Sequence, residues 1–197
     1  MEKMLEAAKK VCTHEHTALH IYQKNEERFW SIFHISIKNN DTNNSSNNDS
    51  KEENKINNKI NKKYQIIKTR MEYEQKGHDI LSKTFRTSDM LEWNQGSTDN
   101  DNDNNNDKGI KDMDTKIGKE TYNLISIPIV NIEANVHAVM TFSNRYTIGE
   151  NNEHNQDHFS EQNKEDLEFY CIEMSNIFDE RYHEISMQIA VSSSSDD

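Results

Sequence analysis

The chain of 197 residues is acidic, with a formal net charge of -12 at pH 7, and only 32% of its residues are hydrophobic. This charge argues against general binding to nucleic acid or to anionic membrane surfaces, because both depend largely on Lys and Arg. No run approaches 18 apolar residues and the N-terminus lacks an apolar signal region, so neither a membrane helix nor secretion is expected. The two cysteines, Cys12 and Cys171, fit no disulfide framework or zinc motif, which favours a reducing, cytoplasmic location.

The apolar residues are unevenly distributed along the chain. Two Asn-rich segments, 39–63 and 96–119, contain almost no large apolar side chains. Such segments bury too little apolar surface to offset chain entropy, so we expect both to be disordered insertions. The acidic, Ser-rich tail 190–197 is expected to be disordered as well. The rest of 1–189 is long enough for one hydrophobic core, and we expect a single domain.

The N-terminal half shows one helical and several extended patterns. Residues 2–13 carry apolar side chains at spacings of three and four, which predicts a helix. Alternation predicts strands at 17–22 and 28–37, and the second strand should be covered on both faces because both are apolar. Further expected elements are a short strand at 64–67, a helix at 77–87 and an extended piece at 90–93.

The C-terminal half predicts a hairpin followed by a long helix. Two apolar runs, 124–130 and 136–142, flank a short polar break, which favours an antiparallel pair. Pro128 cannot donate a backbone hydrogen bond, so it should lie at a sheet edge, at a bulge or where pairing ends. After a polar loop at 144–158, Ser160 is a plausible helix N-cap. The apolar stripe of this helix comprises Leu167, Tyr170, Cys171, Met174, Phe178, Tyr182 and Ile185.

This order of elements resembles that of a GAF domain, a sensor module related to PAS domains. Three segments carry the resemblance: the apolar-Pro-apolar triplet at 127–129, the strand that runs into Asn144 and Arg145, and the start of the last helix at 159–166. The resemblance implies an α+β fold with a central antiparallel sheet. It also implies that the N- and C-terminal helices pack on one face of that sheet.

The sequence is most similar to GAF domains of cyclic-nucleotide phosphodiesterases, which carry an Asn-Lys…Phe…Asp-Glu signature. This chain keeps the Asn and the Phe and differs at the other three positions: Asn144, Arg145, Phe159, Asn163 and Lys164. The family's Lys–Asp ion pair would become a hydrogen bond between Arg145 and Asn163. Alternatively, Glu165 or Asp166 would be the partner of Arg145.

Two functions are compatible with this resemblance. The first is a non-catalytic protein-interaction or dimerisation module that uses the terminal helices, with these candidate contact residues: Met4, Ala8, Val11, Phe169, Ile172 and Ile189. The alternative is a sensor for a cyclic nucleotide or another small molecule, acting in trans. Its pocket, between the sheet and the short helix, would be lined by Phe85, Thr87, Trp93 and Phe142.

Neither an enzyme nor a metal site nor a cofactor is expected. Catalytic GAF relatives that reduce methionine sulfoxide need reactive thiolates at the pocket, whereas both cysteines here are expected to fill core space. His14 and His16 are expected at the surface, and no ligand set at metal spacing accompanies them. The Asp-rich segment 99–103 lacks the Gly and Glu of a calcium-binding EF-hand loop.

Overall fold

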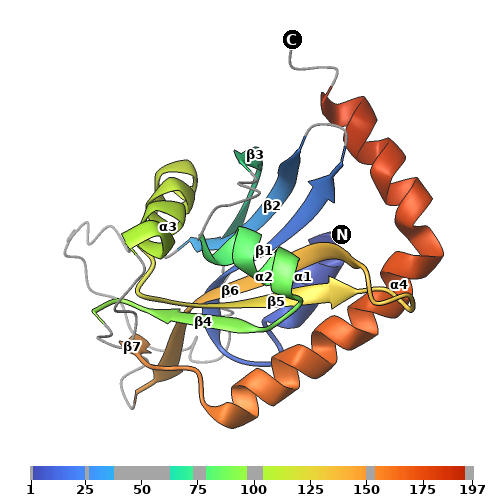
Figure 1. The fold of residues 1–197 in the computed structure, drawn as a ribbon. Helices are drawn as coiled ribbons and strands as arrows, with labels where there is room; N and C mark the ends of the chain where they lie inside the picture. Colours follow the sequence, from blue (N-terminus) through green and yellow to red (C-terminus); the bar gives the residue numbers. More distant parts are fainter. Residues whose placement is uncertain are drawn as a thin grey trace, which may run out of the picture.

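The computed structural model describes residues 2–24, 27–37, 63–72, 79–96, 104–149 and 154–193. These residues form a seven-stranded antiparallel sheet of order β3-β2-β1-β6-β5-β4, with β7 paired to β6 (Figure 1). The strands are β1 (His14–Gln23), β2 (Arg28–Ile37), β3 (Lys63–Glu72), β4 (Leu91–Asn94), β5 (Asn123–Val130), β6 (Val136–Ile148) and β7 (His154–Gln156). The helices are α1 (Glu2–Ala8), α2 (Ile80–Thr87), α3 (Asn104–Ile117) and α4 (Glu161–Ser193).

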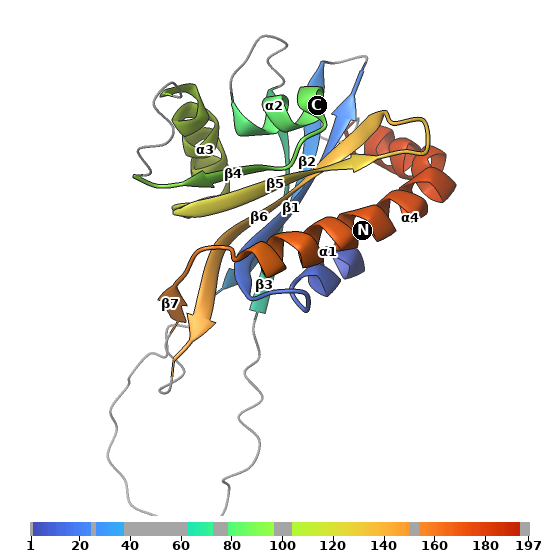
Figure 2. The ribbon, with the colours of Figure 1, turned by 60° about the horizontal axis from the view of Figure 1, so that its bottom comes forward.

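Helices cover both faces of the sheet, with α1 and α4 on one face and α2 and α3 on the other (Figure 2). The first core, beneath α1 and α4, includes Leu5, Leu19, Ile32, Ile125, Met140, Phe142, Leu167, Cys171 and Phe178. The second core, beneath α2 and α3, includes Ala18, Phe29, Phe33, Ile80, Leu81, Trp93, Ile110, Met113, Leu124 and Val139. The predicted α+β fold, with its central antiparallel sheet and both terminal helices on one face, is confirmed.

Strand β2 shows why the sheet has two cores. Successive side chains of a strand point to opposite faces. Trp30 and Ile32 therefore enter the first core, while Phe29 and Phe33 enter the second. The prediction that this strand is covered on both faces is confirmed.

The β5–β6 hairpin is also confirmed, and Pro128 lies at an edge as its chemistry requires. Strand β4 pairs with β5 only as far as Ser126, so among the described strands Pro128 has a partner on one side alone, at Val139 of β6. The register of the hairpin shifts between Ile129 and Val130. Beyond Ser126, one edge of β5 is therefore left open within the described sheet.

Several element boundaries differ from the predicted ones because strand pairing extends beyond the apolar pattern. Strand β3 pairs with β2 over its full length, from Lys63 to Glu72, although only its centre is apolar. The predicted loop at 144–158 is wrong in part, since β6 runs to Ile148 and pairs there with β7. Helix α1 ends at Ala8, because β1 begins at His14 and pairs with both β2 and β6.

The largest correction concerns the second Asn-rich segment. Predicted disorder at 96–119 is wrong for 104–117, which form α3 and bury Ile110, Met113 and Ile117. These three side chains recur at spacings of three and four, enough to seal the second core from within a polar sequence. Residues 97–103 and 38–62 lie outside the described residues.

Helix α4 is longer than predicted. It continues to Ser193, so the disorder expected at 190–197 is wrong for 190–193, and 194–197 lie outside the described residues. Of the predicted apolar stripe, Leu167, Cys171 and Phe178 are fully buried. Helix α4 includes Tyr182 and Ile185, but their side chains are not among those that the structure describes. Within the described chain, no helix meets the length and hydropathy needed to cross a membrane.

Candidate functional site

The signature positions form a junction that fixes the start of α4 to the end of β6. The Arg145 guanidinium donates from Nε to Asn163 Oδ1 at 3.2 Å and from Nη1 to Thr13 Oγ1 at 2.7 Å. Its carboxylate partner is Asp157, with Nη2 3.9 Å from Oδ2. The predicted hydrogen bond between Arg145 and Asn163 is confirmed, whereas the alternative pairing with Glu165 or Asp166 is wrong.

Asn144 completes this junction from an unusual backbone conformation. Its φ of 60° is left-handed, a region that Asn tolerates better than most residues. Its Oδ1 accepts from the Tyr122 amide at 3.0 Å, and its Nδ2 donates to the Glu120 carbonyl at 2.8 Å. The side chain thereby ties the segment before β5 to β6.

The remaining signature residues are structural in the same way. Ser160 and Asn163 form a reciprocal cap, in which each side-chain oxygen accepts from the other residue's amide at 3.2 Å. Lys164 Nζ lies 2.7 Å from Glu92 Oε2, which joins α4 to β4. Phe159 is buried in the first core. The signature residues therefore hold elements of the fold together.

The four residues predicted to line a ligand pocket do not come together. Phe85 and Trp93 belong to the second core, whereas Phe142 is buried in the first, on the other face of the sheet. Thr87 is exposed at the end of α2. The prediction is wrong for Phe142 because it alternates with Val139 along β6, and only the Val139 face points toward α2.

The space beneath α2 is filled by aromatic rings. The Phe85 ring centroid lies 4.5 Å from that of Tyr22 and 5.5 Å from that of Phe29. A cavity beside α3, lined in part by His16, Thr121 and Thr141, has a volume of only about 10 Å³. A space of this size holds about one water molecule, so a nucleotide requires α2 or α3 to move.

Buried polar side chains cross the second face of the sheet in a polar belt, which comprises Ser31, His20, Thr141 and Ser126. Nδ1 of His20 lies 2.7 Å from Ser31 Oγ, and Nε2 lies 3.0 Å from Thr141 Oγ1. Ser126, opposite Thr141 on the next strand, has no partner for its Oγ in the described structure, and neither has Thr84 Oγ1. Unpartnered buried hydroxyls are uncommon and mark this face as incompletely satisfied.

The histidines of β1 are buried, so the predicted surface position of His14 and His16 is wrong. Neither ring nitrogen of His16 makes a hydrogen bond in the described structure, although Glu15 Oε2 lies 3.6 Å from Nε2. Burial lowers the pKa of His16 to about 4 and that of His20 to about 3. Both rings are therefore neutral at pH 7. Among the described residues, no cluster of three or more metal-ligating side chains occurs.

Both thiols are buried, as predicted. Burial raises the pKa of Cys12 to about 11 and also raises the pKa of Cys171. The thiolate is the reactive form of cysteine, so neither side chain is an activated nucleophile.

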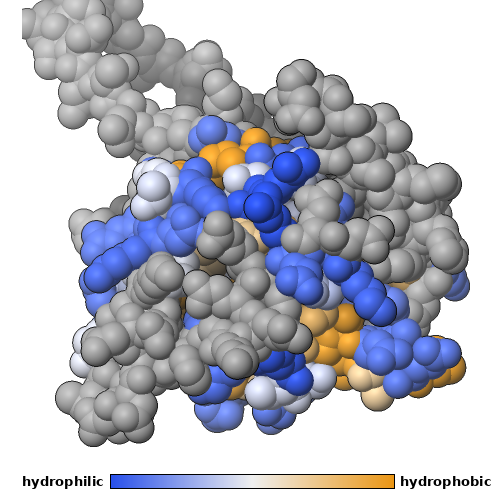
Figure 3. Space-filling model, turned by 45° about the horizontal axis from the view of Figure 1, so that its top comes forward, coloured by the Kyte–Doolittle hydropathy of each residue, from blue (hydrophilic) through white to orange (hydrophobic). Residues whose placement is uncertain are grey.

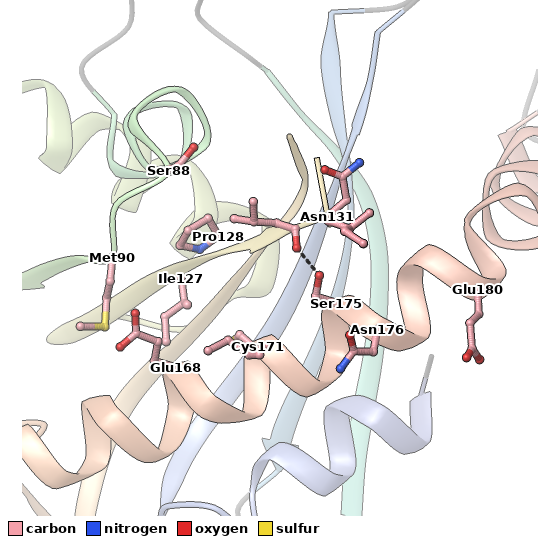
Figure 4. A pocket seen from close by; sticks show the side chains of 13 residues that line it. Ser88, Met90, Ile127, Pro128, Asn131, Glu168, Cys171, Ser175, Asn176 and Glu180 are labelled. Carbon is pink, nitrogen blue, oxygen red and sulfur yellow. Dashed lines mark hydrogen bonds between the residues drawn. The ribbon is translucent and has the colours of Figure 1, made fainter. Parts of the chain in front are cut away.

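An open groove lies between the β5–β6 hairpin and α4, with a volume of about 700 Å³ (Figure 4). We call it the hairpin groove. Its apolar lining comes from both walls, with Ile127, Pro128 and Ile132 on the hairpin side and Ile172 on α4. Ser175 Oγ on α4 donates to the carbonyl of Val130, which connects the two walls. Nothing in the sequence pattern indicates this groove except Pro128 and an isolated apolar residue, Ile132, in a polar turn.

Exposed apolar side chains lie on α4 and at the tip of the hairpin. Six large hydrophobic residues of the described chain are exposed, and four of them lie on α4 or at the hairpin tip: Ile132 at 93%, Phe169 at 64%, Ile172 at 56% and Ile177 at 37%. We call the three on α4 the α4 patch. Figure 3 shows that hydrophobic residues reach the surface in confined areas bordered by hydrophilic ones.

Of the candidate contact residues on the terminal helices, only those on α4 are exposed among the side chains that the structure describes. Phe169 and Ile172 are exposed, but Ala8 is fully buried and Met4 and Val11 pack against the first core. Helix α1 is a core element because its apolar residues face the sheet. The Ile189 side chain lies outside the described residues.

The sequence matches no family model and no curated protein. Among solved structures, the chain is similar to the GAF domain of a phosphoenolpyruvate-protein phosphotransferase from Acinetobacter, with 9% identity and a TM-score of 0.49, covering 91% of this chain and 80% of that chain. It is also similar to the GAF domain of a two-component sensor histidine kinase from Bacillus halodurans, with 13% identity and a TM-score of 0.47, covering 92% and 94%. Both are GAF domains, the family that the sequence resembles.

Proposed function

We propose that this chain is a non-catalytic GAF-type domain that acts in signalling by binding another protein at the α4 patch and the hairpin groove. The topology and the Asn144–Arg145 junction support the family. The observation that carries the proposal is the concentration of exposed apolar side chains on α4 and at the hairpin tip, where four of the six described ones lie. Free, buried thiols support a reducing compartment such as the cytoplasm.

Exposed aromatic and branched side chains favour a protein partner over a small molecule at this surface. Large apolar patches on otherwise polar surfaces commonly mark interaction sites, and aromatic anchors dominate binding energy there. Phe169, Ile172 and Ile177 lie within three turns of one helix. Covering them with a partner removes apolar area from water, which is the main favourable term in association.

A second candidate function is a small-molecule sensor beneath α2 and α3. The unpartnered atoms of His16, Ser126 and Thr84 support it, because a polar ligand such as a purine nucleotide would supply the missing hydrogen bonds. Each buried unsatisfied group costs about 1–3 kcal/mol, which ligand binding would recover. Against this stands the small cavity, of about 10 Å³, on that face.

Chemical cross-linking of the whole protein in extracts of its own cells tests the first proposal. The double variant Phe169→Asp, Ile172→Asp places charge on the α4 patch without touching the core. We expect it to lose at least one cross-linked protein that the wild type captures. The matched control is Ile148→Asp, an equally exposed residue at 57%, at the last position of β6.

Capture of the same proteins by the wild type and the double variant would contradict the proposal. A thermal-shift titration with cyclic AMP, cyclic GMP and other purines tests the second candidate. A ligand that binds only the folded state raises Tm by mass action. A shift that persists in the α4 double variant would favour the sensor function.

A further inference from the structure

We infer that the hairpin groove binds an amphipathic helix of another protein, one that presents an apolar stripe flanked by Lys or Arg. This inference rests on the proposed function and names the class of partner. Three features of the molecule support it: the length of the groove, the unpaired edge of β5 and the acidic charge of α4.

The groove is too long for a compact small molecule. Glu168 and Glu180, which both line it, are twelve residues apart on α4 and lie at opposite ends of the view in Figure 4. At 1.5 Å per residue, their Cα atoms are about 18 Å apart along the helix axis. A partner that meets both carboxylates must span that distance, which a helix of about twelve residues does.

The open edge of β5 is a poor template for an added strand. Pro128 has no amide hydrogen to donate, and the carbonyl of Val130 already accepts from Ser175 Oγ. Recognition by strand addition depends on these main-chain groups. We therefore expect a partner to bind mainly through side chains, as an amphipathic helix in a groove does.

The apolar lining fits one face of such a helix. Ile132 at 93% exposure lies on the hairpin wall with Pro128 and Ile127, and Ile172 at 56% exposure lies on the α4 wall. Apolar side chains at positions i, i+3, i+4 and i+7 of a partner helix share one face, so they can pack between these walls.

The charge of α4 selects a basic partner. Residues 161–180 contain seven acidic residues and a single basic residue, Lys164. The Lys164 ammonium is held by Glu92 and Glu161, each at 2.7 Å, so it does not offset Glu168 or Glu180. Complementary charge raises association rates and excludes partners of the same sign.

A second copy of the chain does not fit this description. Each chain carries a net charge of -12, and two α4 surfaces would bring carboxylates together. The lysine-bearing helix α3 is not a substitute, because its apolar residues, Ile110, Met113 and Ile117, are buried against the sheet. Among the described helices, none offers a free apolar face with basic flanks, which favours an occupant from a different protein.

Selection of peptides from a random 16-residue display library on the intact chain tests the inference, since a 16-residue helix spans about 24 Å. We expect enriched peptides to be basic, with apolar residues recurring every three or four positions. Their affinity should fall at least tenfold for Ile132→Asp with Ile172→Asp. It should also fall for Glu168→Gln with Glu180→Gln, and that loss should shrink at high salt.

The inference is overturned if no peptide is enriched, if the enriched peptides are acidic, or if they bind both variants as tightly as the wild type. It is also overturned if sedimentation shows a dimer that Ile132→Asp disperses. Ile148→Asp is the matched control for folding and for unspecific loss of affinity. The cross-linking result separates the two proposals: if the α4 variant loses a cellular partner but the peptides fail, only the helix inference is wrong.

Discussion

Two buried histidines of β1 differ in how completely their ring nitrogens are satisfied. On the α1–α4 face, His14 packs edge-on against Phe142, and its ring nitrogens lie 3.0 Å from the Cys12 carbonyl and 2.5 Å from Thr17 Oγ1. On the α2–α3 face, both ring nitrogens of His16 lack a hydrogen bond in the described structure. His14, at the first position of β1, reaches Phe142 and Thr17 of the first face, whereas His16 lines the small cavity on the second face. The same residue type is therefore satisfied at one position and unsatisfied at the other.

We therefore regard the α1–α4 face as a rigid scaffold and the α2–α3 face as one whose helices can move. The first core is covered by α1 and α4, and the surface that we propose to bind a partner is the outside of α4. The second core combines aromatic rings with the polar belt beneath two short helices. Four predictions, in order of decreasing effect, test this comparison.

The first prediction concerns the scaffold. Phe142→Ala should lower the free energy of unfolding by about 3–5 kcal/mol, because it leaves a cavity in the first core. Met113→Ala, in α3, should cost less, about 2 kcal/mol, because a short helix can move to fill the space. Urea unfolding measures both changes. An equal or larger cost for Met113→Ala would contradict the view that the first core is the more rigid one.

The second prediction concerns pH. Burial lowers the pKa of His14 and of His20 to about 3, and an unfolded histidine titrates near 6.5. Between these values the unfolded chain binds more protons, so stability falls as pH falls below 6.5. At pH 5 each buried histidine should cost about 2 kcal/mol relative to pH 7. His20→Gln should reduce this dependence, and a stability that does not change between pH 7 and pH 5 would refute the neutral buried rings.

The third prediction compares one hydroxyl from each face. Thr17→Val removes a partner of His14 and should destabilise the protein by about 1–2 kcal/mol. Ser126→Ala removes a hydroxyl that has no partner in the described structure, so it should be neutral or stabilising by up to about 1 kcal/mol. Thermal unfolding of both variants and of the wild type measures the two changes in stability. A large loss for Ser126→Ala would show that its hydroxyl is satisfied, for example by water.

The fourth prediction introduces an ion pair at the junction between β6 and α4. Asn163→Asp places a carboxylate near Arg145 and at the N-terminus of α4, and should stabilise the protein by about 0.5–1 kcal/mol. The same substitution in an Arg145→Gln background should stabilise the protein by less. The difference between the two measurements is the coupling energy, and a value of zero would show that the two side chains do not interact.

The hairpin, the cap at Ser160 and the Arg145–Asn163 contact could be predicted because each depends on residues close in sequence or on a short motif. Helix α3 could not, since its three apolar residues are sparse in an Asn- and Asp-rich segment. Only the uncovered second core makes their burial favourable. Gly109 contributes in a way no pattern shows: a Cβ there would lie 2.8 Å from that of Asp79, so its absence allows close approach of α3 to α2.

The candidate site was less predictable than the fold. The exposure of Phe169 and Ile172 follows from the helical stripe, but the groove depends on where β4 stops pairing, which tertiary contacts decide. The pocket prediction failed at Phe142 because strand alternation places it opposite Phe85. The burial of His14 and His16 was missed because β1 extends three residues before its apolar pattern starts.

The central claim is that protein contact occurs at α4 rather than beneath α2. The most direct measurement is photo-cross-linking in living cells with a photoreactive amino acid at position 172, compared with position 148 at the far end of β6. The account predicts a discrete protein adduct from position 172 and none from position 148. Adducts of equal yield from both positions, or none from position 172, would contradict it.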